Sequence, residues 1–434
     1  MSVASQGFRL SAQQEHLWRL QQSAPGESFH AVARISVAGD LDPEALRRAL
    51  ARVVERHEIL RTEFQQVPGV TIPLQVIAAA APLLQLERLE PGRHRLTVAL
   101  PALCADTATL DLLPAEIGRC YAACLGGEEP EPPAMQYADF AEWQAEVLDS
   151  EETATGREHW ARLDLSRSVA GAGEASCTPG RLPVPLDPGL AARFEEIARR
   201  FSAPLDVVLL AAWQTLLQEL SGEPEVTVAV AFAGRKFDEL REAFGLYAAY
   251  LPVASGADGQ APFPDRVRRI QAAVEEAGDW QECFSWRQRV SPSEPEPFLP
   301  FAFSFREASA PFAAAGLTFA VEEAAARIDR STAELHAERR GNGLALELRH
   351  GLPADAAELL AGRFLALLHG LAEAPDAAPG EIEILSVPEL QQLADLNATA
   401  APFPSDLCFH AWFERQAARV PEARAVLHGG SALS

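Results

Sequence analysis

A stretch rich in serine, glycine, alanine, threonine and proline divides this chain near its middle. It contains Ala170-Gly-Ala-Gly173, followed closely by Pro183 and other prolines. Such residues interrupt helices and strands, and 434 residues exceed what one hydrophobic core usually organises. We therefore expect two lobes of similar size, residues 1–165 and 187–395, joined by an inter-lobe linker over residues 166–186.

The first half of the chain alternates helix and strand signals. Ser11-Ala-Gln-Gln14 is a capping box that predicts the start of a helix. Residues 94–100 alternate apolar and polar side chains, which is typical of a half-buried strand. That strand runs directly into Pro101-Ala-Leu-Cys-Ala-Asp-Thr107, and residues 112–123 follow as a helix disturbed by Pro114. The seven residues between them are therefore expected at the carboxyl end of a strand.

The second half repeats this pattern. Asp187-Pro188 supplies an N-cap and a proline for a helix start, and residues 205–220 form a long apolar helical stretch. Strands are predicted over residues 225–231, 301–305 and 344–348. Both halves are thus predicted to be α/β.

Composition excludes several classes of partner and site. The 37 basic and 61 acidic side chains give a net charge of −24, which repels nucleic acid and anionic membranes. Six cysteines are scattered without a disulfide framework, and neither a signal peptide nor a membrane-spanning apolar run is evident. We expect a cytoplasmic protein with reduced thiols and with no nucleic acid or membrane partner.

Neither the histidines nor the acidic runs indicate a binding site. The histidines are dispersed and no pair shows the i, i+4 spacing of a helical metal site, so no metal is expected. The acidic run from Glu128 to Glu131 and the pair Glu322-Glu323 could be contact patches, but they are interpreted as solvated surface.

A series of motifs runs in order along nearly the whole chain. Its members are Leu10-Ser-Ala-Gln-Gln14 with Leu17-Trp18, Val54-Glu-Arg-His-Glu-Ile-Leu-Arg-Thr62, Tyr137-Ala-Asp-Phe-Ala-Glu-Trp143, Ala231-Phe-Ala-Gly-Arg235 and Phe244-Gly-Leu-Tyr-Ala-Ala-Tyr-Leu-Pro252. Each is weak alone, but the ordered set resembles the condensation domain superfamily of nonribosomal peptide synthetases. Near the end, Phe409-His-Ala-Trp-Phe-Glu-Arg-Gln-Ala-Ala-Arg-Val-Pro421 resembles the opening of an adenylation domain, although an ordinary amphipathic helix would also fit.

The resemblance implies a fold and a set of partners. The fold is α/β, with two chloramphenicol-acetyltransferase-like lobes in a V shape and a tunnel between them. Phosphopantetheine arms of partner peptidyl carrier proteins enter that tunnel, so no cofactor is bound directly. Residues 396–434 are expected to be a linker and the start of an adjoining adenylation domain.

The resemblance also exposes a missing catalytic motif. Members of this superfamily carry His-His-x-x-x-Asp-Gly at a strand end, and their second histidine handles or orients the amine proton. Here Pro101 and Ala102 replace both histidines, Asp106 remains and Thr107 replaces glycine. Proline and alanine offer no side-chain proton acceptor, so no catalytic residue is expected. The resemblance gives Asp106 a structural role and makes Arg61 its candidate partner.

Two further departures and one thiol bear on the tunnel. Ala249 replaces an asparagine common in the superfamily, and Asp279-Trp-Gln-Glu282 replaces a polar His-Gln segment. Cys104 lies inside the degenerate motif, but no histidine is near it in sequence to activate it. The predicted tunnel has therefore lost more than one polar group.

Three functions remain open at this point. The leading hypothesis is a catalytically degenerate platform that recruits a tailoring enzyme, such as a β-hydroxylase or another oxygenase, to a carrier-bound amino acid. The alternative is an active condensation domain that forms an amide or ester bond without the histidine, because proximity alone lowers a barrier. A third is a structural spacer or gate. Whether the domain has any activity of its own is left open by the sequence.

Overall fold

The computed structural model describes residues 7–24, 26–67, 69, 72–78, 83–133, 135–163, 165, 179–256, 258–286, 298–400 and 406–434. Contacts divide the chain into two units, residues 1–385 and 386–434. Within the described residues, no helix has both the length and the hydrophobicity that a membrane span requires.

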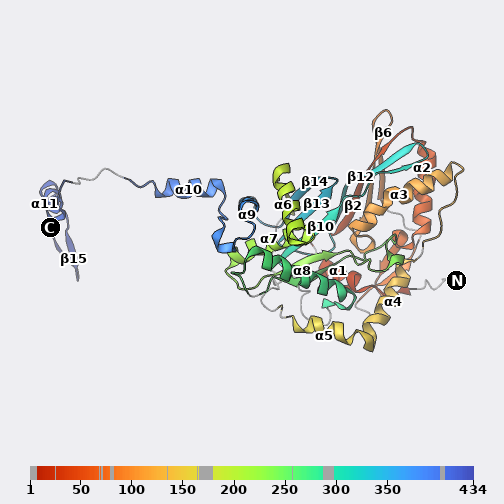
Figure 1. Ribbon diagram of the computed structural model, residues 1–434, viewed down its shortest axis with the longest axis horizontal. Coiled ribbons are helices and arrows are strands. Elements are labelled where there is room, and N and C mark those ends of the chain that lie inside the picture. The colour runs from red at the N-terminus through yellow and green to blue at the C-terminus, as the bar shows by residue number, and fades with distance from the viewer. Residues whose placement is uncertain are drawn as a thin grey trace. The chain divides into compact units, whose positions relative to one another are not determined.

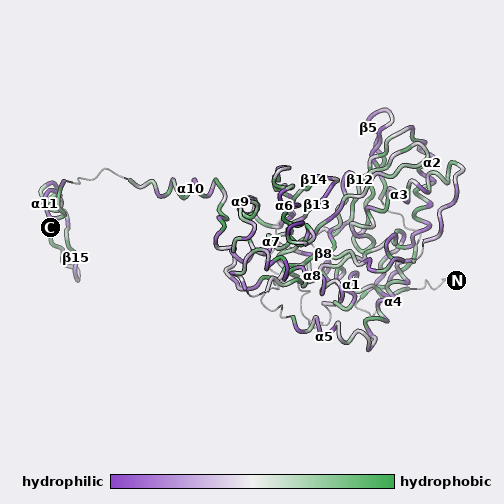
Figure 2. Tube along the Cα trace, viewed as in Figure 1, coloured by the Kyte–Doolittle hydropathy of each residue, from purple (hydrophilic) through white to green (hydrophobic). Residues whose placement is uncertain are grey.

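An antiparallel five-stranded sheet organises the first part of the larger unit. Its strands, in spatial order, are β11 (Phe312–Ala314), β12 (Leu317–Ala326), β2 (His30–Ala38), β6 (Arg93–Pro101) and β5 (Leu83–Glu90). Helices α2 (Pro43–Arg56) and α3 (Thr107–Cys124) pack against each other, and α3 also packs on β2 and β12. The tip of the β5–β6 hairpin is hydrophilic in Figure 2.

Smaller elements surround this sheet. A three-stranded sheet has the order β1 (Gly7–Phe8), β4 (Leu74–Ile77) and β3 (Thr62–Gln65), and a 3-10 helix (Glu58–Arg61) precedes β3. Helices α1 (Ala12–Ser23), α4 (Tyr137–Asp149) and α5 (Ala154–Arg162) complete this part, with a 3-10 turn (Glu151–Thr153) between α4 and α5. Ser11 caps α1 in a capping box with Gln14, as the sequence predicts.

A six-stranded mixed sheet organises the second part of the unit. Its order is β7 (Gly180–Val184), β14 (Gly343–His350), β13 (Ala333–Arg340), β10 (Phe301–Glu307), β8 (Thr227–Phe232) and β9 (Ala249–Ala254). Four helices pack with it, as Figure 1 shows: α6 (Pro188–Phe201), α7 (Leu205–Ser221), α8 (Phe263–Asp279) and α9 (Ala354–Glu373). Shorter 3-10 turns lie at Asp238–Leu240, Gln281–Cys283 and Pro379–Glu381.

The described residues form two hydrophobic cores, and the α/β fold is confirmed. The boundaries differ from those predicted. Strand β12 lies in the second half of the chain but pairs along its length with β2 of the first sheet. The segment predicted as a linker, 166–186, contains β7, which pairs with β14; residues 166–178 lie outside the described residues. Sheet pairing satisfies backbone groups that a solvated linker would leave to water.

Helix α3 also differs from its prediction, because it begins at Thr107 and not near residue 112. Asp106 provides the N-cap, and Pro114 lies inside the helix without ending it. The Asp106 carboxylate accepts a hydrogen bond from a free N–H group of the first turn, so the helix can start at Thr107. The prediction considered only Pro114 and therefore placed the start too late.

The smaller unit contains α10 (Val387–Asn397), α11 (Phe409–Arg419) and a two-stranded hairpin of β15 (Val426–His428) and β16 (Ser431–Leu433). The unit begins at residue 386, before the predicted linker start at residue 396. The interpretation of these residues as the start of an adenylation domain stays a prediction, as do the V shape and the tunnel.

Candidate functional site

The segment Pro101 to Thr107, predicted as a degenerate motif, lies at the carboxyl end of β6, as expected. Pro101 is the last strand residue and pairs across the sheet with His30 of β2. It is exposed, whereas the 3-10 helix Ala102–Cys104 that follows is buried, and Ala102 has 0% of its surface accessible. At the two positions predicted to replace the superfamily's histidines, this strand end therefore presents one exposed pyrrolidine ring and one buried methyl group.

Asp106 is the most connected residue of the motif. It is completely buried, and its Oδ1 accepts a hydrogen bond from the backbone N–H of Thr109 at 2.8 Å. Arg235 donates from both terminal nitrogens, at 2.7 Å to Oδ2 and 3.0 Å to Oδ1. The backbone N–H groups of Tyr247 and Ala248 each donate to Oδ2 at 2.9 Å. The carboxylate thus joins α3 to two segments of the second half of the sequence.

The predicted pairing of Asp106 with Arg61 is wrong. Arg61 lies in the 3-10 helix before β3, where it reaches the carbonyl of Ala78 at 3.5 Å and Glu58 at 3.7 Å. The partner of Asp106 is Arg235, which belongs to the Ala231-Phe-Ala-Gly-Arg235 motif, and no role was predicted for that motif. Sequence position cannot distinguish two arginines that are both distant from the carboxylate along the chain.

Electrostatics keep Asp106 ionised. Burial by itself raises the pKa of a carboxyl group, but the Arg235 charge, its hydrogen bonds and the backbone N–H groups hold the pKa of Asp106 below its ordinary value. The Arg235 guanidinium also lies 4.6 Å from the centre of the Tyr247 ring, in a cation–π contact. Because both oxygens of the Asp106 carboxylate accept hydrogen bonds, this side chain holds the start of α3 against the backbone at Tyr247 and Ala248.

Close backbone approach explains why glycine stands at position 245. Its φ is +150°, and a Cβ there would lie 1.9 Å from the ring of Tyr137. Thr109 donates from Oγ1 to the Gly245 carbonyl at 2.7 Å and accepts from the Gly245 N–H at 3.0 Å. The Tyr137 hydroxyl donates to the carbonyl of Leu246 at 2.6 Å. These bonds fix the loop that carries the Asp106 donors.

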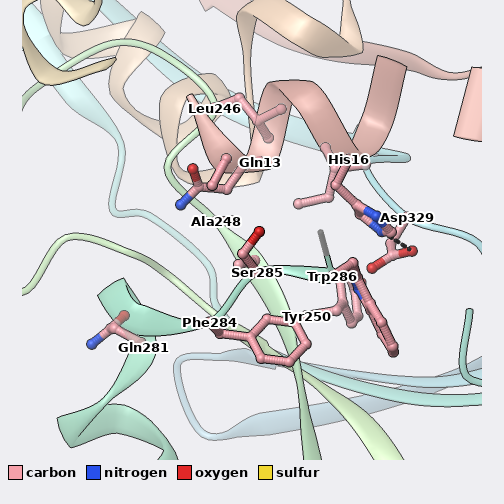
Figure 3. A pocket seen from close by; sticks show the side chains of 13 residues that line it. Gln13, His16, Leu246, Ala248, Tyr250, Gln281, Phe284, Ser285, Trp286 and Asp329 are labelled. Carbon is pink, nitrogen blue, oxygen red and sulfur yellow. Dashed lines mark hydrogen bonds and ion pairs between the residues drawn. The ribbon is translucent and has the colours of Figure 1, made fainter. Parts of the chain in front are cut away.

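A pocket that is open to solvent lies beside this loop (Figure 3). Its lining comes from α1, from residues 246–250, from the segment after α8 and from the loop after β12: Ala12, Gln13, His16, Leu246, Ala248, Ala249, Tyr250, Gln281, Phe284, Ser285, Trp286, Ile328 and Asp329. Ala249 and Gln281, which belong to the two segments predicted to depart from the superfamily, both line this pocket. Pro101, Ala102, Asp106 and Thr107 are not among its lining residues.

The sequence reasoning missed the contact between His16 and Asp329 in this pocket. His16 Nε2 lies 3.2 Å from Asp329 Oδ1, and the imidazole stacks on Trp286 at 5.9 Å between ring centres. The Ser11 capping box predicts a helix that includes His16, so the sequence could have identified a histidine on α1 as a candidate site residue. The sequence around Asp329 contains no comparable signal, because only the fold brings Asp329 and His16 together.

A second polar group, also missed, connects to the pocket through Tyr250. The Tyr250 hydroxyl donates to Glu334 at 2.9 Å, Ser304 also donates to Glu334, and Ser304 Oγ lies 2.8 Å from His336 Nδ1. Burial, followed by the Arg349 charge, lowers the pKa of His336 to about 3. This imidazole is therefore neutral at physiological pH and cannot serve as a strong base there.

The cysteine within the motif has no activating environment. Cys104 is 2% exposed, and burial raises its pKa to about 12. Burial, then Glu116, likewise raises the pKa of Cys120 to about 12. Cys177 lies outside the described residues. Thiols of such high pKa contain almost no nucleophilic thiolate at neutral pH.

The acidic runs singled out in the sequence make ion pairs within the chain. Glu129 pairs with Arg52 at 2.9 Å, Glu322 with Arg95 at 2.9 Å, and Glu323 with both Arg34 and Arg181. Among the described residues, no cluster of three or more His, Cys, Asp or Glu side chains is arranged to hold a metal ion.

The structure is an α/β fold with two hydrophobic cores, and Ala102 to Ala105 of the strand-end motif belong to the core of the first sheet. A family model described as "Condensation domain" matches residues 5–90 and 79–394, and the chain belongs to the condensation domain family of nonribosomal peptide synthetases. It is 24% identical over 480 residues to bacitracin synthase 3 of Bacillus licheniformis, and 25% identical over 476 residues to surfactin synthase subunit 1 of Bacillus subtilis (strain 168). These alignments cover 98% of this chain but only 7% and 13% of those much longer relatives.

Solved structures share the fold. A complex of the X-domain and OxyB from teicoplanin biosynthesis matches with a TM-score of 0.73 at 22% identity, covering 89% of this chain and 97% of that chain. The first condensation domain of the CDA synthetase matches with a TM-score of 0.72 at 17% identity, covering 88% and 100%. At these identities the likeness establishes the fold and leaves the choice between docking and catalysis to the site itself.

Proposed function

We propose that this chain is a catalytically silent condensation-type domain that recruits a tailoring enzyme to an amino acid held on a neighbouring carrier protein. Its partners would be peptidyl carrier proteins with their phosphopantetheine arms, the adjoining adenylation domain and an oxygenase such as a β-hydroxylase. The setting would be the cytoplasm, where such assembly lines take up free amino acids.

The observation that carries this proposal is the chemistry at the end of β6. The position of the superfamily's second histidine holds Ala102, whose methyl group is fully buried, and Pro101 beside it has no ionisable group. General acid–base help to an attacking amine typically contributes about 10²–10⁴-fold in rate. Without the two histidines that carry this role in the superfamily, any condensation activity should be lower by about that factor.

The remaining motif residues do not replace the lost base. Both oxygens of Asp106 already accept hydrogen bonds, and the ion pair with Arg235 keeps its proton affinity low. Cys104 is buried with a strongly raised pKa. Both residues support the fold of the strand end, which is what a platform has to preserve when it no longer catalyses.

The likeness to the X-domain supports the docking half of the proposal, because an X-domain of this fold occurs in a complex with OxyB. A transient partner would bind through a modest surface patch, and such interfaces commonly bury less than about 1,200 Å². The patch on this chain is to be located by experiment.

One observation favours a second candidate, a histidine-free acyltransferase. The pocket beside the loop of residues 245–248 combines an aromatic wall with a few polar groups, which is typical of ligand sites. Holding two tethered reactants in register can supply up to about 7–11 kcal/mol of a barrier. A spacer or gate, the third alternative, would need neither the pocket nor a docked enzyme.

A paired assay separates these functions. Upstream and downstream carrier proteins are loaded with aminoacyl groups and followed by intact-protein mass spectrometry, with and without this domain, and with a His-His-containing condensation domain as positive control. A candidate oxygenase is then added. The platform predicts no acyl transfer, and addition of one oxygen atom to the tethered amino acid only when domain and oxygenase are both present.

Acyl transfer that depends on this domain would overturn the platform and establish the transferase. If neither transfer nor oxygenation depends on the domain, the spacer becomes the better account.

A further inference from the structure

A single arginine links the helix that follows the strand-end motif to the second sheet. Arg306 of β10 donates from Nε to Oδ2 of Asp111 on α3 at 2.9 Å, and one of its terminal nitrogens donates to the other oxygen of that carboxylate. Its second terminal nitrogen donates to Glu338 of β13 at 3.1 Å. The side chain of Arg306 is 8% exposed and that of Asp111 is 17% exposed. The guanidinium is therefore shared between carboxylates on two different elements and is largely removed from water.

Asp111 and Arg306 lie on elements that belong to different hydrophobic cores. On α3, Leu110 and Leu113 belong to the core of the first sheet. On β10, Phe303 belongs to the core of the second sheet. Between these apolar side chains, α3 and β10 meet through opposite charges. Polar contacts between two cores permit the parts that they join to move relative to one another.

The other ion pair at the start of α3 lies on the first-sheet side of this contact. Asp106 bonds to Arg235 and to the backbone N–H of Tyr247. Residues 243–247, although they come from the second half of the chain, supply side chains to the core of the first sheet. Breaking the Asp111–Arg306 contact would therefore leave the Asp106 hydrogen bonds intact.

The chain crosses from the second sheet to the first directly beside the Asp111–Arg306 pair. β10 ends at Glu307 and β11 begins at Phe312, and residues 308–311 between them form neither helix nor strand. Ser309 in this connection donates from Oγ to Asp111 Oδ1 at 3.3 Å. A short irregular segment can absorb changes in backbone angles while the elements on either side stay intact. The connection is thus placed where a hinge would have to be.

Burial limits how strongly this ion pair holds the two parts together. The attraction between Asp111 and Arg306 repays the cost of removing both groups from water only in part, and their separation would return both to water. Arg306 would keep a partner, because Arg306 and Glu338 face each other on neighbouring strands of one sheet. Glu338 also pairs with Arg340 at 2.7 Å. The separated form is therefore charge-balanced on the side of the second sheet.

We propose that the Asp111–Arg306 ion pair is a reversible latch: it holds α3 against the second sheet when it is formed, and the two separate when it breaks. In the open form Arg306 stays with Glu338, Asp111 is hydrated, and residues 308–311 supply the hinge. The inference goes beyond the proposed function, because it applies equally to a platform and to a transferase. Any partner that binds the two forms unequally shifts the balance between them.

The test measures the distance between two spin labels by double electron–electron resonance on the full chain. One label is attached at Arg48→Cys on α2 and the other at Arg199→Cys on α6, both exposed positions on opposite sides of the latch. Cys124, Cys177 and Cys408 are replaced by serine beforehand, because the remaining cysteines are buried. The chain with an unaltered latch should give one main distance and a minor longer one.

The variant Arg306→Met leaves the Asp111 carboxylate in the closed form without its arginine partner. Because an uncompensated buried charge is strongly unfavourable, the ratio of open to closed molecules should rise by about 100-fold or more, and the longer distance should become the main one. Arg268→Met is the matched control, because it removes an exposed ion pair with Asp265 on α8. It should keep the distances of the unaltered chain, and circular dichroism checks that each variant is folded.

A double variant separates the latch from lost packing. Asp111→Leu combined with Arg306→Met removes both charges, and apolar replacement of a buried ion pair is often neutral or stabilising. The double variant should therefore return to the shorter distance.

An unchanged short distance in Arg306→Met overturns the proposal. A double variant as open as Arg306→Met overturns it too, because the opening would then come from lost packing and not from charge. No carrier protein or oxygenase takes part in these measurements. The outcome of the recruitment assay therefore leaves the latch undecided, and the outcome for the latch leaves the platform undecided.

Discussion

Replacing Asp106 by alanine tests whether the surviving motif aspartate holds the fold. The change removes the acceptor of three backbone N–H groups, those of Thr109, Tyr247 and Ala248. It also leaves the Arg235 guanidinium, 6% exposed, without its counter-charge. Breaking a buried ion pair from one side typically costs about 3–5 kcal/mol. We expect a loss of that size in the free energy of unfolding.

The assay is chemical denaturation of the full chain, followed by far-ultraviolet circular dichroism, together with thermal melting. A loss of about 3–5 kcal/mol corresponds to a fall of roughly 5–10 °C in the melting temperature of a large domain. Asp265→Ala is the control, because that carboxylate forms an exposed pair with Arg268 at 2.9 Å. It should change stability by less than about 1 kcal/mol.

A second variant separates the ion pair from general damage. Replacing Arg235 by methionine as well removes the uncompensated charge, so the double variant should be less destabilised than the sum of the single ones. A loss below about 1 kcal/mol in Asp106→Ala, or strict additivity in the double variant, would refute the structural role of Asp106.

Three further predictions concern pH, thiols and the missing histidine. Burial raises the pKa of Glu116, but hydrogen bonds from His57 and Arg56 outweigh that effect and lower the pKa to about 2. Glu116 should therefore contribute about 3 kcal/mol to the free energy of unfolding above pH 4.5, and this contribution should be lost as the pH falls toward 2. Glu116→Gln should flatten that part of a plot of unfolding free energy against pH. In the native chain Cys104 should resist iodoacetamide, as followed by peptide mass mapping, while the exposed Cys408 reacts; rapid Cys104 labelling would contradict its burial. Ala102→His should lower the free energy of unfolding by about 1–3 kcal/mol, because the larger side chain overpacks a fully buried position. It should not by itself restore acyl transfer. A gain of acyl transfer in the mass-spectrometry assay would show that the rest of the site is intact.

Local sequence predicted those parts of the fold that local chemistry controls. The capping box at Ser11, the strand before Pro101 and the α/β character of both halves follow from periodicity and caps, and the structure confirms them. The start of α3 was misplaced, because the capping carboxylate of Asp106 outweighs the local signal of Pro114.

The sequence by itself determined that the two motif histidines are absent, since a residue's chemical identity does not depend on its surroundings. Only the tertiary structure decided what the surviving residues contact. It paired Asp106 with Arg235 in place of Arg61, added β12 to the first sheet, and brought His16 to Asp329 across most of the chain. Long-range hydrogen bonds and ion pairs depend on packing between distant segments, and no local pattern in either segment encodes the partner.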